Sequence, residues 1–332
     1  MLYLNEDEVR PLVSMRDIIG YCEEAYKLYG QHQAGKLYAK FSPMISYPTK
    51  VPHTDVDYRS GTMEKIPALC TTLGWGFWDN PIKYNLPSVS VVIALNDAKT
   101  GLPLCLMTGY YLGAARTGAA GGVCSKYLAR KDSRSLGLVG TGNVGLYMLW
   151  SHLELFKNIE VVRAWSRSKG RREKFARTCG KRFGVKVKAV DSAREAVQGM
   201  DIVCAAVPTR EPVIKDEWVR KGMHINAFGA DSKGKQELDP KILQRADKIV
   251  VDNIDQCKLG GEINVPLSQG LISDSAVHAQ IGEVVNGWKK GRERSDELTI
   301  MDSTGVSALD VVTYYRAYEK ALKKGVGTKV SF

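Results

Sequence analysis

The sequence predicts an α/β domain built on a doubly wound parallel sheet, joined to a second domain of α+β type. Three observations lead to this prediction. The chain has 332 residues, which suits two hydrophobic cores better than one. From Leu136 onward, short apolar segments alternate with helical ones, as parallel strands do with their crossover helices. Before Leu136 this alternation is absent, and two strand-like segments follow each other directly.

The N-terminal part begins with two predicted helices, because Asn5 and Ser14 each stand three residues before an acid, as in a capping box. Prolines punctuate the stretch 37–87, where we expect only short strand-like segments without defined bounds. A turn at 97–101 then joins two apolar runs into a predicted hairpin. The strands of this hairpin are Ser88–Leu95 and Leu102–Met107.

The second half supplies the strands and helices of the α/β domain. Two of its helices are predicted at Asn143–Phe156 and Lys169–Phe183, and the last helix, Ala308–Lys324, is expected to return to the first domain. We therefore place the α+β domain at 1–112 with 308–332, and the α/β domain with the parallel sheet at 113–307. The predicted strands are Leu136–Val139, Glu160–Trp165, Val185–Val190, Ile202–Ala206, His224–Phe228, Lys248–Val251 and Leu298–Met301.

Composition and charge argue against several classes of protein. The formal net charge is +11, but no basic stripe interleaved with aromatic residues and no helix-turn-helix pattern indicates a nucleic-acid binder. The seven cysteines and five histidines show no metal-ligand spacing. No apolar run reaches the roughly 18 residues of a membrane span, and acids rather than cations follow Met1. We therefore expect a cytoplasmic protein with no metal, no nucleic-acid partner and no membrane partner.

A glycine pattern marks the start of the α/β domain. Gly140, Gly142 and Gly145 form a G-x-G-x-x-G run directly between an apolar strand and a helix, the setting in which this pattern binds a dinucleotide pyrophosphate. The glycines allow a tight turn, close approach to the phosphates and close helix–strand packing, and the helix N-terminus supplies amide groups. The sequence thus predicts a Rossmann-type dinucleotide site, with a ligand-free tight turn as the alternative.

The end of the next strand bears on which dinucleotide binds. A site selective for NAD carries an acid roughly 20 residues beyond the glycines, where it bonds the ribose 2′-hydroxyl. This chain instead has Ser166, Arg167, Lys169 and Arg171 there. A hydroxyl and several cations favour a 2′-phosphate, so we expect NADP(H). NAD(H) is the alternative, in which Arg167 only stacks over the adenine.

Three further segments resemble the ornithine cyclodeaminase and μ-crystallin family. Their order, spacing and flanking helices fit over nearly the whole chain. Two shorter runs, Gly234–Asp239 and Gly260–Asn264, are similar to the archaeal alanine dehydrogenase branch of that family, and the ketimine reductase branch is also similar. The three segments are Ala115–Ala120, His224–Leu238 and Met301–Gly305.

The resemblance implies a homodimer whose outer domain carries the dimer sheet and much of the substrate pocket. It also implies chemistry at an imine carbon that bears a carboxylate. We therefore expect an NAD(P)H-dependent oxidoreductase, an imine reductase or amino-acid dehydrogenase, that interconverts an amino acid and its imine or 2-oxo acid. Two alternatives stay open: a cyclodeaminase for ornithine or lysine with an internally recycled cofactor, and an NADP-bound ligand-binding protein without turnover.

Such chemistry needs a cation for the carboxylate and a group that handles the proton of the nitrogen. Arg116 is expected to bind the substrate carboxylate, with an interdomain salt bridge as the alternative. Asp231 matches the catalytic acid/base of the family, with a turn or helix cap as the alternative. Thr117 is expected at a helix N-terminus beside a cofactor phosphate. The residues expected to contact the cofactor are Thr117, Gly140, Thr141, Gly142, Asn143, Val144, Gly145, Ser166, Arg167, Lys169, Arg171, Val207, Lys235, Ser303 and Thr304.

One position departs from the family pattern. The family places a substrate-anchoring lysine after the segment that reads Ile66-Pro67-Ala68 here, whereas this chain has glycine at that point, within the run Gly74-Trp75-Gly76-Phe77-Trp78. Lys40 and Arg59 are candidates for the substrate-binding cation, and Lys83 could enter from a neighbouring loop. Aromatic residues follow the glycine and would form either a pocket wall or an interface: Trp75, Phe77 and Trp78.

Overall fold

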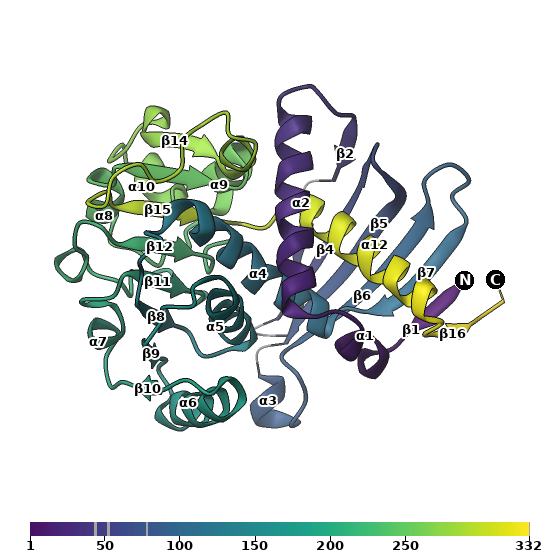
Figure 1. The fold of residues 1–332 in the computed structure, drawn as a ribbon, viewed down its shortest axis with the longest axis horizontal. Coiled ribbons are helices and arrows are strands. Elements are labelled where there is room, and N and C mark those ends of the chain that lie inside the picture. Colours follow the sequence, from purple (N-terminus) through teal and green to yellow (C-terminus); the bar gives the residue numbers. More distant parts are fainter. Residues whose placement is uncertain (43–44, 52–53, 78, 332) are drawn as a thin grey trace. The chain divides into compact units, whose positions relative to one another are not determined.

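The computed structural model describes residues 1–42, 45–51, 54–77 and 79–331. The chain divides into two compact units, and their elements are labelled in Figure 1. The first unit comprises Met1–Arg116 and Ser307–Phe332, and the second comprises Thr117–Val306. Among the described residues, no helix is both long and apolar enough to cross a membrane.

The first unit is built on one mixed sheet. Its strands lie in the order β16-β1-β7-β6-β5-β4-β2, with β3 paired to β4. The predicted hairpin is confirmed as β6 and β7, and both capping boxes are confirmed at the starts of α1 and α2. The elements are β1 Leu2–Leu4, α1 Glu6–Leu12, α2 Met15–Gln33, β2 Ala39–Phe41, β3 Ile45–Pro48, β4 Thr54–Met63, β5 Ile66–Phe77, α3 Asn80–Lys83, β6 Val89–Asp97, β7 Pro103–Thr108, α4 Tyr110–Leu128, α12 Ser307–Lys324 and β16 Thr328–Lys329.

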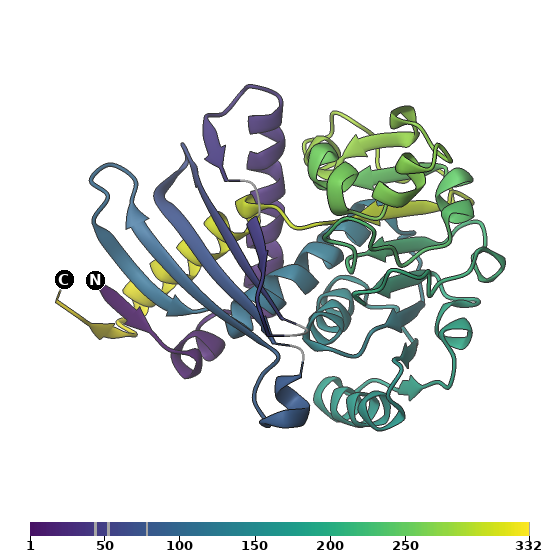
Figure 2. The same cartoon turned by 180° about the vertical axis from the view of Figure 1, so that it is seen from behind.

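The two longest strands of this sheet, β4 and β5, lie in the stretch 37–87, where only short strand-like segments were expected. In β5, buried residues such as Ala68 and Cys70 alternate with more exposed ones such as Leu69 and Leu73. Strand residues point to the two faces in turn, so one face of the sheet is buried. Helix α12 packs on that inner face against β4, β5 and β6, with α2 beside it (Figures 1 and 2).

The second unit contains the predicted parallel sheet. Its strands lie in the order β10-β9-β8-β11-β12-β15-β13-β14, all parallel, and only β14 had no counterpart in the prediction. The chain order reverses between β8 and β11, the place where doubly wound sheets bind ligands. The elements are β8 Ser135–Val139, α5 Asn143–Leu155, β9 Val161–Trp165, α6 Lys169–Phe183, β10 Val187–Ala189, α7 Ala193–Val197, β11 Ile202–Ala205, β12 His224–Ala227, α8 Pro240–Gln244, β13 Lys248–Val251, α9 Ile254–Gly260, α10 Asn264–Ser268, β14 Val277–Gln280, α11 Ile281–Val285 and β15 Thr299–Asp302.

Apolar clusters cover both faces of this sheet, which explains its double winding. In β11, Ile202 and Cys204 belong to the cluster beneath α5 and α6, whereas Val203 and Ala205 belong to the cluster on the opposite face. Such strands are buried on both sides and read as continuous apolar runs. The seven cysteines are all buried and free, and no group of side chains in the described part of the chain could hold a metal ion.

Two buried histidines belong to the polar interior of the second unit. His152 donates from Nδ1 to the carbonyl oxygen of Met148, and its Nε2 lies 2.8 Å from the hydroxyl of Ser125. His224 Nε2 lies 3.2 Å from the side-chain oxygen of Asn226, and the side-chain nitrogen of Asn226 donates to the hydroxyl of Ser125. Burial lowers the pKa of His152 to about 4 and, with the charges of Arg292 and His152, that of His224 to about 3. Both rings are therefore neutral in the folded protein at neutral pH.

We expect these histidines to make the protein sensitive to mild acid. Below a pH of about 6.5, their unfolded pKa, the two histidines bind protons in the unfolded chain but stay neutral in the folded chain. Their contribution to the free energy of unfolding is therefore present above this pH and is lost as the pH drops toward 4. Each histidine contributes a loss of up to about 1.4 kcal/mol per pH unit. Urea unfolding between pH 7 and pH 5 measures how stability changes with pH in the wild type and in His224→Gln. Relative to the wild type, the variant should lose up to about 1.4 kcal/mol less per pH unit on acidification. An equal loss in the variant and the wild type contradicts the assignment.

Candidate active site

The glycine turn has the geometry that the sequence predicted. Gly140 follows β8 with a φ of 117°, a conformation that favours glycine, and its nitrogen donates to the carbonyl oxygen of Trp165. A Cβ on Gly145 would run into the carbonyl oxygen of Gly140, so α5 packs closely on the turn only because this residue is glycine. A Cβ on Gly142 would meet no atom of the described residues within 4 Å. The open side of the turn therefore lies at Gly142.

The N-terminus of α5 presents backbone amides beside this open side. Gly142 is the N-cap residue, and no side chain caps the helix. Uncapped amides at a helix N-terminus bind anions, because their N–H groups and the helix dipole both favour negative charge. Val207, at the end of β11, lies against the same turn, since a Cβ on Gly140 would come within 3.2 Å of it. These residues fit the pyrophosphate of a dinucleotide.

The end of β9 lies beside the turn. The hydroxyl of Thr141 donates to Ser166 Oγ over 2.7 Å, which links the glycine turn to the second strand. Arg167, Lys169 and Arg171 are exposed, so their cations are available to an anion in solution. Arg172 differs from them because it is buried and bonded to the carbonyl oxygen of Ser166 and to Asp191.

Asp231 lies beyond the carboxyl end of β12, at the edge of the sheet where ligands bind in this fold. Its carboxylate is 49% exposed and accepts a hydrogen bond of 2.5 Å from the ammonium group of Lys235, whose side chain is 20% exposed. The structure therefore brings together two residues that the sequence assigned to different roles, an acid/base and a cofactor contact.

Two buried glutamates, which the sequence did not single out as site residues, hold the loops at this edge. The carboxylate of Glu237 accepts 2.7 Å hydrogen bonds from the nitrogens of Val207 and Gly229, which follow β11 and β12. Glu262 accepts hydrogen bonds from the nitrogens of Glu237 and Leu238. Burial raises the pKa of each glutamate to about 8. Their position within the Gly-Lys-Gln-Glu-Leu and Gly-Gly-Glu-Ile-Asn runs is the signal that could have found them.

Ser303 and Thr304 follow β15 at the same edge of the sheet. Both hydroxyl groups donate to the buried carboxylate of Asp252, and the nitrogen of Gly305 donates to it as well. Asp302 accepts from the nitrogen of Ile263. The carboxylate of Asp252 thus fixes the Ser303–Gly305 loop. The hydroxyl groups of Ser303 and Thr304 hold this loop in place, in addition to any contact with a ligand.

Arg116 lies in the first unit, within a buried ion-pair cluster. Its Nε lies 2.9 Å from Asp310 Oδ1, and Arg59 Nη1 lies 3.7 Å from Asp310 Oδ2. Burial alone would lower the pKa of Arg116, but the charge of Asp310 and a hydrogen bond to the Tyr314 hydroxyl raise it above its ordinary value. The cluster joins one arginine of α4 to one of β4 through an acid of α12.

Other sequence candidates lie elsewhere in the first unit. Lys40 is exposed on β2, and Lys83 is exposed on α3, where it forms an ion pair with Asp79. Trp75 and Phe77 alternate with the inward residues of β5 and so lie on the outer face of the sheet, away from Arg59. Trp78 lies outside the described residues.

The expectation of a helix N-terminus at Thr117 is wrong. Helix α4 begins at Tyr110, and Thr117 lies in its interior. Residues 110–116, which precede Thr117, include Leu, Ala and Arg, and these residue types favour helix. The helix therefore starts before the Arg-Thr-Gly segment, at which its N-terminus was expected. Gly118 in this helix permits close contact with α5, since a Cβ there would run into the backbone of Tyr147 and Met148.

Comparison with known proteins identifies similar chains along the whole sequence. A family model described as ornithine cyclodeaminase/mu-crystallin family matches residues 2–325. An alanine dehydrogenase of Archaeoglobus fulgidus is 41% identical over 335 residues, which cover 100% of this chain and 98% of that protein.

Two solved structures are similar in fold and sequence. One is an archaeal alanine dehydrogenase dimer with bound NAD, at a TM-score of 0.91 and 40% identity, covering 100% of this chain and 99% of that one. The other is Δ1-pyrroline-2-carboxylate reductase of Thermococcus litoralis in complex with NADH and L-proline. It matches at a TM-score of 0.93 and 38% identity, covering 99% of this chain and 100% of that one.

Proposed function

The chain belongs to the ornithine cyclodeaminase/mu-crystallin family, and from this premise we propose that it reduces an imine of a 2-oxo acid to an amino acid and catalyses the reverse oxidation. Its class is that of the NAD(P)-dependent oxidoreductases acting on amino acids and imines. The single observation that carries the proposal is similarity over the full chain to enzymes named for both kinds of substrate, alanine and pyrroline-2-carboxylate.

We propose roles in this reaction for one residue at the carboxyl edge of the parallel sheet and for one residue of the first unit. The nicotinamide, when bound, donates or accepts the hydride. We assign the proton to Asp231, whose exposed carboxylate beside Lys235 can protonate an imine nitrogen and take the proton back from an ammonium group. Arg116 is assigned to the substrate carboxylate, which a guanidinium group binds through two parallel hydrogen bonds.

For the cofactor we propose NAD(H), with NADP(H) accepted as well. The archaeal alanine dehydrogenase structure contains NAD and the reductase structure contains NADH, which supports NAD(H). No acid follows β9 in this chain to repel a 2′-phosphate, and the exposed cation of Arg167 stands there instead.

Arg167→Asp tests the choice of cofactor. Because a carboxylate repels a 2′-phosphate and bonds a 2′-hydroxyl, kcat/KM for NADPH should fall by about 10- to 100-fold while that for NADH holds or rises. Steady-state kinetics with both cofactors measures this. Lys186→Asp, at an exposed position in the connection between α6 and β10, is the control for a change of charge alone. An equal loss with both cofactors contradicts the assignment.

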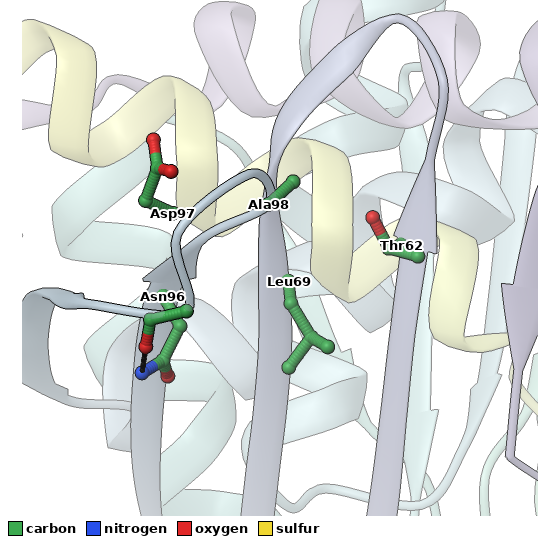
Figure 3. A pocket seen from close by; sticks show the side chains of 6 residues that line it. Thr62, Leu69, Asn96, Asp97 and Ala98 are labelled. Carbon is green, nitrogen blue, oxygen red and sulfur yellow. Dashed lines mark hydrogen bonds between the residues drawn. The ribbon is translucent and has the colours of Figure 1, made fainter.

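We also propose a homodimer built on the outer face of the first unit's sheet. Leu69 and Leu73 are exposed there, at 38% and 36%, and no helix in the described part of this unit covers that face (Figure 2). A hollow of about 410 Å³ lies at the edge of the face, lined by Leu69, Thr62 and the turn after β6. Figure 3 shows how the side chains of Leu69, Thr62 and Ala98 lie around it. An exposed apolar face of this kind marks an interface, and the similar alanine dehydrogenase is a dimer.

A substrate panel tests the proposed function directly. Pyruvate with ammonia, pyruvate with methylamine, and Δ1-pyrroline-2-carboxylate are mixed with the protein and NADH or NADPH, and absorbance of the reduced cofactor is followed. We expect oxidation of the cofactor with at least one of them. Binding of the cofactor without turnover across this panel and a wider panel of 2-oxo acids contradicts the proposal.

A further inference from the structure

We propose that Glu237 is a positioning residue that holds two loops of the second unit at a fixed spacing, the loop beside the glycine turn and the loop that carries Asp231. The β11 loop, residues 206–209, follows β11, and the β12 loop, residues 228–235, follows β12. This inference rests on the proposed function, in which the first loop lies beside the cofactor and the second supplies the acid/base.

The β11 loop lies against the glycine turn at which we place the pyrophosphate. A Cβ added to Gly140 would lie 2.8 Å from the carbonyl oxygen of Ala206 and 3.2 Å from Cγ1 of Val207. The nitrogen of Ala206 donates to the carbonyl oxygen of Val139, which is the last residue of the strand before the turn. A shift of the β11 loop would therefore change the space beside the turn in which a dinucleotide binds.

The β12 loop is held firmly on the side that follows Asp231. Gly260, at the end of α9, packs so closely on this loop that a Cβ there would lie 3.0 Å from the carbonyl carbon of Asp231. Farther along the loop, the nitrogen of Gly234 donates to the side-chain oxygen of Asn264 over 2.9 Å. These contacts fix the backbone after Asp231, so its place relative to the β11 loop depends on what holds the backbone before it.

Glu237 joins the two loops there, with one carboxyl oxygen on each. Its Oε1 accepts a hydrogen bond of 2.7 Å from the nitrogen of Val207, and its Oε2 accepts one of 2.7 Å from the nitrogen of Gly229. The residue is 0% exposed, so solvent does not compete for either bond. Gly229 leaves room for the carboxyl group, because a Cβ at this position would lie 2.5 Å from Oε1 of Glu237.

Only a carboxyl group can make both bonds. Two N–H groups that point at one side chain need two accepting atoms, and a carboxyl group accepts through both oxygens in its charged and in its neutral form. A carboxamide accepts through one oxygen, and its nitrogen only donates. Glu237→Gln would therefore set an N–H group against the N–H group of one loop. Because the β12 loop keeps its contacts with Gly260 and Asn264, we expect the β11 loop to move.

Glu262 provides a comparison, because it is also 0% exposed and also accepts hydrogen bonds from backbone nitrogens. One of its oxygens, Oε1, accepts from the nitrogens of both Glu237 and Leu238, at 3.0 and 2.7 Å. Its Oε2 adds a contact of 2.9 Å to the nitrogen of Glu237. Glu262→Gln can thus keep an oxygen that serves both nitrogens, although it makes the same chemical change as Glu237→Gln.

Titration of NADH, followed by its fluorescence, tests the role of Glu237 at the cofactor. For Glu237→Gln we expect Kd to rise by about tenfold, because the β11 loop no longer keeps its place beside the glycine turn. For Glu262→Gln the rise should be smaller, about threefold or less. A Kd that is equal in Glu237→Gln and the wild type overturns the proposal, and so does an equal rise in the two variants.

A purely structural role of Glu237 predicts a different pattern, which Asp201→Asn provides. Asp201 is a buried carboxylate at the amino edge of the same sheet, where it accepts hydrogen bonds from the nitrogens of Arg134 and Ser135 and pairs with Arg130. Asp201→Asn should lower the melting temperature and leave Kd for NADH unchanged. If Glu237→Gln only lowers the melting temperature, or if Asp201→Asn raises Kd as much, the proposal is wrong.

Steady-state kinetics tests the link to Asp231. At saturating NADH, kcat of Glu237→Gln should fall by about 10- to 100-fold, since a misplacement of about 1 Å between reacting groups costs up to this much. KM for the 2-oxo acid should stay within about threefold, because its carboxylate is assigned to Arg116. An unchanged kcat overturns the link. Gly229→Ala pushes the carboxyl group away from the β12 loop, and it replaces Glu237→Gln, with the same expected results, if that variant does not fold.

The titration of NADH keeps this inference distinct from the proposed function, because it needs no turnover. If the wild type binds NADH but reduces no imine, the proposed function fails, and the Kd values of Glu237→Gln, Glu262→Gln and the wild type still decide the role of Glu237 beside the cofactor. If the wild type reduces an imine while Glu237→Gln binds NADH equally well, the proposed function stands and the positioning role of Glu237 is overturned.

Discussion

Replacing Asp231 by Asn should lower kcat by about 10²- to 10⁴-fold, the range that a lost general acid/base produces. The amide keeps the size of the side chain and a hydrogen-bonding oxygen, but it cannot donate a proton to an imine nitrogen and take it back. The carboxylate is half exposed, so the substitution leaves no buried group without a partner. Binding of NADH, followed by its fluorescence, should change little.

The control for this variant is Asp274→Asn. Asp274 is also an exposed aspartate paired with a lysine, at 2.6 Å from Lys258, but it lies in the turn before β14. The Asp274→Asn substitution removes the same charge and the same kind of ion pair without changing the proposed site. Loss of activity in Asp231→Asn alone supports the acid/base role. A kcat within a few-fold of wild type assigns the chemistry of the proton to another group.

Replacing Gly142 by Ala should weaken binding of the dinucleotide by about 100-fold, because a methyl group then occupies the open side of the turn where the backbone approaches the phosphates. The methyl group meets no described atom within 4 Å, so the melting temperature should stay within a few degrees of wild type. Titration of NADH with fluorescence detection measures the affinity.

Two other glycines serve as comparisons. Gly20→Ala adds a methyl group to α2, where it also meets no described atom within 4 Å, and should leave cofactor binding unchanged. Gly145→Ala forces α5 away from Gly140, so it should lower both affinity and melting temperature. Cofactor affinity that is equal in Gly142→Ala and wild type contradicts the location of the pyrophosphate at this turn.

The parallel sheet was predictable because its strands are short, apolar and separated by helices with clear signals. The glycine turn, with a strand before it and a helix after it, also had a local pattern. Strand β5 had only a weak pattern, because Pro67, Gly74 and Gly76 interrupt the residues that favour strands. The burial of every second residue in its first half, on the face that packs against α12, reveals it. Here tertiary packing overrides local propensity.

The residues of the candidate site also differ in whether the sequence alone could place them. Gly142 and Asp231 stand in recognisable runs and could be placed from the sequence. Arg59 and Asp310 come from distant parts of the chain and meet only in the folded unit, so no spacing rule relates them. Glu237 stands within a recognised run, but its function is to accept hydrogen bonds from two loops, which the sequence does not reveal.

Transfer of deuterium from the cofactor to the amino acid tests the central claim most directly. The protein is incubated with NADH carrying deuterium at C4 of the nicotinamide, a 2-oxo acid and ammonia, or the cyclic imine, and the product is analysed by NMR and mass spectrometry. We predict an amino acid that carries the deuterium at its α-carbon, with one equivalent of NADH oxidised. The contradicting result is bound NADH that never passes its label to any imine of the panel.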